Sequence, residues 1–177
     1  MKFLKLCGQW STSVLLLISD ACVLIGIEQA GLTTSMFSLP YQFAVPDVLF
    51  FEELSTRHVK LMEMGLMSMF MRSELIHEAY NLRQQYCKPS VNDLLALVLA
   101  KDNEALLLTG DKALREVANI YKVEVHGTIW LVDQMIQKKI ITIEIARIAF
   151  QYMKNFGSRL PWKEVDKLLG SVGNCSE

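Results

Sequence analysis

The sequence lacks an excess of charge of either sign. Its 177 residues include 18 Lys and Arg and 19 Asp and Glu, which gives a formal net charge of -1. No overall basic field is therefore available to attract nucleic acid or an anionic membrane, so local basic groups would have to bind any phosphate. The sequence also has no internal repeat and no low-complexity linker, and its length is that of a single domain with one well-buried core.

Cysteine is scarce and follows no metal-binding pattern. The chain has four cysteines, Cys7, Cys22, Cys87 and Cys175. None belongs to a CxxC pair, and no histidine stands at ligand spacing, which argues against a zinc site or a redox dithiol. The apolar run at 14–27 resembles a secretory signal, but Asp20 interrupts it. Because a charge in a membrane segment costs about 3 kcal/mol, we expect a cytoplasmic protein without a membrane anchor.

Short apolar runs alternate with helical patterns along most of the chain. The expected strands are 14–18, 43–45, 65–71, 105–108 and 123–125, of which 65–71 could also end a helix. The expected helices are 21–30, 46–54, 74–86, 91–100, 112–120, 128–138, 143–155 and 161–169. This order predicts a three-layer α/β/α fold with a parallel sheet of four or five strands and extra C-terminal helices. The predicted parts are an N-terminal extension at 1–13, a main domain at 14–140, helices at 141–170 that pack on it, and a tail at 171–177.

Acidic residues follow two of the predicted strands. Asp20 lies two residues after strand 14–18, and Asp111 lies three residues after strand 105–108. Functional sites of parallel sheets form beyond the carboxyl ends of the strands, so both acids are expected at the same edge. Asp93 stands in the first turn of its predicted helix, and Glu53 lies on the helix that begins at Pro46. We expect these four acids to form one site.

A group of carboxylates without a basic partner is typical of a site for Mg²⁺ or Mn²⁺, because both ions prefer oxygen ligands. Such ions neutralise a phosphodiester and activate water for its cleavage. The alternative is structural: Ser90 to Asp93 also forms a possible capping box, and Asp111 could simply cap its helix. Capping alone leaves Asp20 unexplained.

Four segments together resemble the PIN-domain ribonucleases. They are LLLISDACVL, VPDVLFFEEL, SVNDLLALVLAKDNEALLLTGDKALREVA and VHGTIWLVDQM. The sequence is most similar to a VapC-like bacterial and archaeal branch that carries a Gly-Thr motif before an extra helix. The resemblance spans about 14–140, and its most specific part runs from Asp93 to Asp111.

This resemblance implies residue roles. Asp20, Asp93 and Asp111 match the family's metal ligands, and Glu53 matches its helix glutamate as a fourth catalytic acid. Thr109 is expected at the substrate site, where it would hydrogen-bond a metal ligand or the water. From their position one turn into the helix after Asp111, Lys112 and Arg115 would either bind substrate phosphates or form a solvated helix face. Glu52 competes with Glu53, because neighbours on a helix point about 100° apart and only one would face the site. Two departures are Cys22, where relatives have a small hydroxyl or amide residue, and the region after Asp111, where only Glu116 could supply a further acid.

The function that the resemblance implies is hydrolysis of RNA by an Mg²⁺- or Mn²⁺-dependent endoribonuclease. It would act as the toxin of a type II toxin–antitoxin pair, as a homodimer inhibited by a small antitoxin protein. One alternative is a PIN-like scaffold that has lost catalysis and acts only in binding. Another is a receiver-like signalling domain, which would need adjacent acids after the first strand and a lysine after the last. Here His126 and Gly127 follow the last strand.

Overall fold

The computed structural model describes residues 14–171. Their centre is a parallel sheet of five strands in the order β3-β2-β1-β4-β5. The strands are β1 (Leu15–Ser19), β2 (Tyr41–Pro46), β3 (Met67–Met69), β4 (Leu106–Leu108) and β5 (Val125–His126). The chain adds β2 and β3 on one side of β1 and then returns to place β4 on the other side. This order makes the gap between β1 and β4 the switch point of the sheet.

Helices connect the strands and continue after the last one. They are α1 (Ala21–Gln29), α2 (Thr33–Phe37), α3 (Asp47–Leu49), the π-helix η1 (Phe50–Leu54), α4 (Lys60–Glu63), α5 (Ser73–Gln85), α6 (Val91–Asp102), α7 (Lys112–Ile120), α8 (Thr128–Gln137), α9 (Ile143–Asn155) and α10 (Trp162–Ser171). None of these helices is long and apolar enough to span a membrane.

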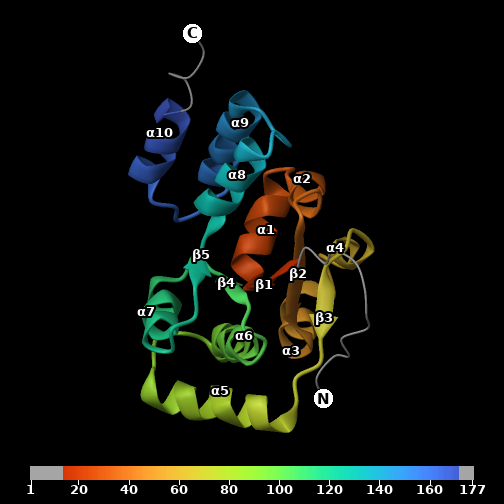
Figure 1. The fold of residues 1–177 in the computed structure, drawn as a ribbon, viewed down its shortest axis with the longest axis vertical. Coiled ribbons are helices and arrows are strands. Elements are labelled where there is room, and N and C mark those ends of the chain that lie inside the picture. The colour runs from red at the N-terminus through yellow and green to blue at the C-terminus, as the bar shows by residue number, and fades with distance from the viewer. Residues whose placement is uncertain (1–13, 172–177) are drawn as a thin grey trace, which may run out of the picture.

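The helices cover the two faces of the sheet (Figure 1). Alternate strand residues point to opposite faces, so Leu17 joins one core with α1, α8 and α9, while Ile18 joins the other with α5, α6 and α7. Helix α6 has seven consecutive buried residues, Leu94 to Ala100, which explains why its sequence reads as an unbroken apolar run. The predicted α/β/α layers and parallel sheet are confirmed.

The predicted elements differ from the observed ones in a few places. Pro46 ends β2 instead of standing in the first turn of a helix. The following helix changes from α to π geometry at Phe50, where the Ser55 N–H donates to the Phe50 carbonyl five residues back at 2.8 Å. Helix α2 was not expected. The predicted extension at 1–13 and residues 172–177 lie outside the described residues.

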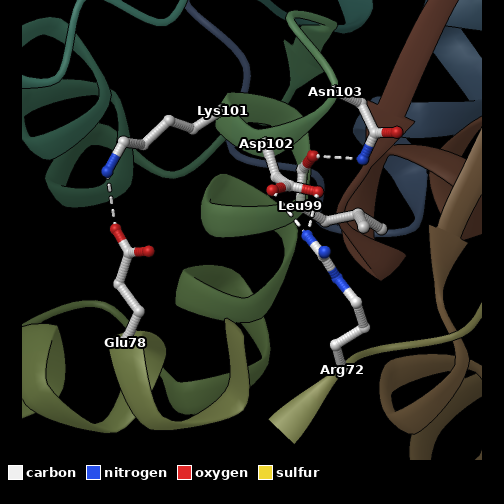
Figure 2. A network of polar contacts seen from close by, with 6 residues as sticks. All are labelled: Arg72, Glu78, Leu99, Lys101, Asp102 and Asn103. Atoms are coloured by element: carbon white, nitrogen blue, oxygen red, sulfur yellow. Dashed lines mark hydrogen bonds and ion pairs between the residues drawn. The ribbon is translucent and has the colours of Figure 1, made fainter. Parts of the chain in front are cut away.

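Helix α6 is tied to α5 at its C-terminal end (Figure 2). Arg72, next to the start of α5, donates through Nη2 to both carboxylate oxygens of Asp102, at 2.8 and 2.9 Å. Lys101 Nζ donates to Glu78 Oε1 at 2.6 Å. Exposed pairs of this kind contribute little individually, about 0 to 1 kcal/mol. Together with the packing of α5 against α6, these pairs set the orientation of α6. They thereby help to position its N-terminal end relative to the sheet.

Candidate metal centre

Asp20 lies at the switch point of the sheet. Its backbone N–H donates to the Leu108 carbonyl at 2.9 Å, which extends the β1–β4 pairing by one residue. Its side chain caps α1, because Oδ1 accepts from the Val23 N–H at 2.8 Å. Asp20 is only 2% exposed. The carboxylate is therefore fixed beyond the ends of the two central strands.

Thr109 connects Asp20 to Asp111. Its hydroxyl accepts from the Asp111 N–H at 3.0 Å, and its side chain also forms a hydrogen bond with Asp20. Asp111 caps α7, where its Oδ1 accepts from the Leu114 N–H at 2.7 Å. Thr109 is completely buried. The sequence suggested it as a substrate contact, and the structure places it between two of the predicted metal ligands.

Asp93 occupies the first turn of α6 and forms a capping box with Ser90. The Ser90 N–H donates to Asp93 Oδ2 at 2.9 Å, and the Asp93 N–H donates to Ser90 Oγ at 3.1 Å. All three aspartates therefore take part in helix capping, and the expectation that capping would leave Asp20 unexplained was wrong, because Asp20 caps α1. Capping does not exclude a second role, because an ionised carboxylate has about four acceptor positions.

The three aspartates line one cavity of about 370 Å³. Burial raises the pKa of Asp20 from its ordinary 3.8 to about 6, and the charge of Asp93 adds to the increase, although hydrogen bonds from Thr109 and Val23 oppose it. Cys22 lines the same cavity. Burial, followed by the charges of Asp20, Asp93, Glu53 and Asp111, raises the pKa of its thiol to about 11. The four predicted acids are therefore close enough to act on one side chain.

Glu53 lies outside the cavity that holds the three aspartates. It lines a neighbouring cavity of about 210 Å³ together with Glu52 and Asn92. Asn92 Nδ2 donates to Glu53 Oε1 at 2.6 Å and to Glu52 Oε2 at 3.0 Å. Both glutamates thus contact the start of α6, whereas only one of them was expected to face the site. Asn92 was missed by the sequence reading, although it directly precedes Asp93.

The two basic residues that were considered as substrate contacts, Lys112 and Arg115, lie in different surroundings. Arg115 donates through Nη1 to the Thr109 carbonyl at 3.0 Å and lines a second cavity beside the acidic one. Lys112 is exposed and lines neither of these two cavities. Glu116 lines a cavity next to the α5–α6 connection, so it cannot serve as a further acid of the site. Arg159, between α9 and α10, lines both the acidic and the second cavity and was not anticipated.

Residues 16–174 match the family DUF3368, which is described as a PIN domain. The chain belongs to this PIN-domain family. A solved PilT N-terminus domain protein from the hyperthermophilic archaeon Sulfolobus solfataricus P2 is 15% identical, with a TM-score of 0.49 over 69% of this chain and 93% of that one. No curated protein matches the sequence.

PIN domains are generally nucleases and typically use divalent metals. Within the described range 14–171, no three side chains of His, Cys, Asp or Glu are already arranged to hold a metal. The three aspartates nevertheless supply the oxygen ligands that Mg²⁺ prefers. Mg²⁺ usually keeps several waters and binds through one or two carboxylates. The cavity therefore suits a partly hydrated ion, and an ion enclosed entirely by protein ligands would fit it less well.

Proposed function

We propose that this PIN domain is an Mg²⁺- or Mn²⁺-dependent ribonuclease that hydrolyses RNA phosphodiester bonds. The observation that carries the proposal is the buried Asp20, whose pKa is raised beside Asp93 and Asp111 in one cavity. Keeping an ionised carboxylate buried without a positively charged partner is costly. Carboxylates at close range also repel one another when they are ionised. A cation bound among them would remove both costs. Such an arrangement is therefore typical of a functional site.

In this proposal Asp20, Asp93 and Asp111 hold the ion, either directly or through its waters. When bound, the ion supplies an activated water and neutralises charge on the phosphodiester. Thr109 positions two of the ligands through its single hydroxyl. Glu53, held by Asn92, orients water at the edge of the site. Cys22 remains a neutral thiol at neutral pH because its pKa is raised to about 11, so it does not act as a nucleophile.

Hydrolysis of a labelled RNA with Mn²⁺ tests this proposal. Asp20→Asn, Asp93→Asn and Asp111→Asn should each reduce cleavage strongly while remaining folded, because asparagine retains the oxygen needed for capping. Glu116→Gln is the matched control, since Glu116 lines another cavity, and it should cleave as the wild type does. Cleavage that survives all three asparagine substitutions would refute the proposal. Binding of RNA without any cleavage would instead support a PIN-like scaffold.

We further propose the toxin role, with a small antitoxin as inhibitor and a homodimer as the active form. Its support is the family to which the chain belongs together with the acidic site, since uninhibited cleavage of RNA that a cell needs for translation would stop growth. Expression of the wild-type chain should arrest growth, whereas Asp111→Asn should not. Equal growth of the two cultures at matched protein levels would count against this role.

A further inference from the structure

A second cavity, of about 420 Å³, adjoins the acidic cavity. The two cavities share four lining residues, Gly110, Thr128, Arg159 and Leu160. The second cavity lies between the β4–α7 turn, the start of α8 and the α9–α10 connection. Its volume is that of a small-molecule or nucleotide pocket, and the proposed hydrolysis does not require it.

Arg159 stands at the junction of the two cavities. It is the one Lys or Arg side chain, of those the structure describes, that lines the acidic cavity. It is exposed, and within 14–171 its guanidinium makes no ion pair or hydrogen bond. A guanidinium presents a planar set of donors that matches the oxygens of a phosphate. Arg159 is therefore available to a ligand that extends from the acidic cavity into the second one.

Arg115 and the start of α8 form another wall of the second cavity. A Cβ added to Gly127 would lie 3.2 Å from Arg115 Nη1 and 3.3 Å from the Thr109 carbonyl oxygen. Glycine at this position therefore allows the guanidinium to pack closely against the helix start. Gly127 also provides no side-chain cap for the ten-residue α8. The first N–H groups of an uncapped helix favour an anionic partner.

Thr128 places a further polar group at the passage between the two cavities. It is 7% exposed and lines both cavities. No hydrogen bond of its hydroxyl is found among the described residues. Among the described residues no buried side-chain oxygen or nitrogen lacks a partner, so this hydroxyl is open to the cavities and has room for a hydrogen-bond partner there. An oxygen of a ligand that passes from one cavity to the other would supply that partner.

Two acids oppose the positive charge of the second cavity. Asp133 accepts from Gln137 Nε2 at 2.6 Å, and burial raises its pKa. Glu164 is exposed at the opposite wall. With Arg115 and Arg159 they leave the lining almost neutral at pH 7. This balance favours a group with one negative charge and polar donors, such as one nucleotide of a strand, over a multiply charged small anion.

We propose that the second cavity binds the nucleotide next to the scissile phosphate of a single-stranded RNA. Arg159 contacts the phosphate that lies at the junction of the acidic cavity and the second cavity. The proposal rests on the proposed ribonuclease function and adds to it the path of the substrate. A groove that follows the backbone with basic groups is the usual way in which single strands are bound. Thr128 contacts the strand at the passage between the cavities, and Arg115 contacts it within the second cavity.

RNA binding tests this proposal without cleavage. A fluorescein-labelled single-stranded oligoribonucleotide is titrated with Asp20→Asn protein, and its fluorescence anisotropy gives Kd at several salt concentrations. Adding Arg159→Gln should weaken binding about tenfold, as expected for one charge-assisted hydrogen-bonding contact. It should also reduce the slope of log K against log salt by about 0.7, the value for one phosphate contact on a single strand. Arg159→Lys should retain that slope.

The matched control is Arg147→Gln, which removes an exposed arginine from α9 that lines neither cavity. Thr128→Val, which nearly preserves shape, is the second variant and should weaken binding severalfold. Equal Kd values for Arg159→Gln and Arg147→Gln, or no measurable RNA binding, would overturn the proposal. Arg159-dependent binding by a wild type that does not cleave RNA would leave this subsite in place and refute only the ribonuclease function.

Discussion

Replacing Asp20 by asparagine should make the metal-free protein more stable at neutral pH. Burial and Asp93 raise the pKa of Asp20 from 3.8 to about 6 in the folded state. Between these two values the unfolded chain has lost its proton while the folded chain retains it, so stability falls as pH rises through this window. A difference of about 2 pKa units corresponds to about 3 kcal/mol, and this cost is fully present above pH 6.

Asparagine carries no charge at any of these pH values and still accepts the Val23 N–H that caps α1. The variant should therefore match the wild type near pH 3.5 and exceed it by up to about 3 kcal/mol at pH 7.5. Urea unfolding of both proteins in EDTA across this range measures the difference, and groups that titrate alike in both proteins cancel from it.

Mg²⁺ provides an internal check of the same reasoning. At 100 times its Kd, an ion bound only by the folded state adds about 2.7 kcal/mol of stability. This gain should appear in the wild type at pH 7.5 and be much smaller in Asp20→Asn. If the asparagine variant is less stable than the wild type at pH 7.5 in EDTA, or if the two proteins show the same pH dependence, the assigned state of Asp20 is wrong.

Three further substitutions test the surroundings of the site. Thr109→Val should destabilise the fold by about 1 kcal/mol in urea unfolding, because it removes the acceptor of the Asp111 N–H. NMR titration should also show a still higher pKa for Asp20, since the Thr109 hydrogen bond lowers it; an unchanged pKa would contradict that hydrogen bond. Asn92→Ala should lower Mn²⁺-dependent RNA cleavage about tenfold with little change in unfolding midpoint, as expected for the loss of a group that orients a ligand; full activity would show that Glu53 needs no support. Leu107→Ala should cost about 2 to 5 kcal/mol, and a loss below 1 kcal/mol in urea would mean that the sheet is less tightly packed than described.

The sequence predicts the layers of this fold well because its apolar runs record burial directly. The strand at Leu106–Leu108 and helix α6 are buried on nearly all sides, so each appears as an uninterrupted apolar segment. Helix α7 is predicted at the bounds that the structure shows, because Asp111 caps its start. Asp20 and Asp111 could be placed at one edge of the sheet because parallel strands end on the same side.

The parts of the site that were missed depend on geometry without a sequence signal. The change from α to π geometry at Phe50 leaves no mark in composition, and neither do the hydrogen bonds from Asn92 to both glutamates, which join segments far apart in the sequence. Arg159 lies about fifty residues after Asp111 on a connection between two helices. Only the packing of α9 and α10 brings it to the acidic cavity. Distances between such segments follow from tertiary structure, not from local pattern.

The most direct test of the central claim is a calorimetric titration with Mn²⁺. The claim is that Asp20, Asp93 and Asp111 form a divalent-metal site. The wild type should bind Mn²⁺, and Asp111→Asn should bind it roughly ten to a hundred times more weakly. Glu116→Gln should bind as the wild type does, because its side chain lines a different cavity. No binding by the wild type, or equal affinities for the wild type and Asp111→Asn, would contradict the claim.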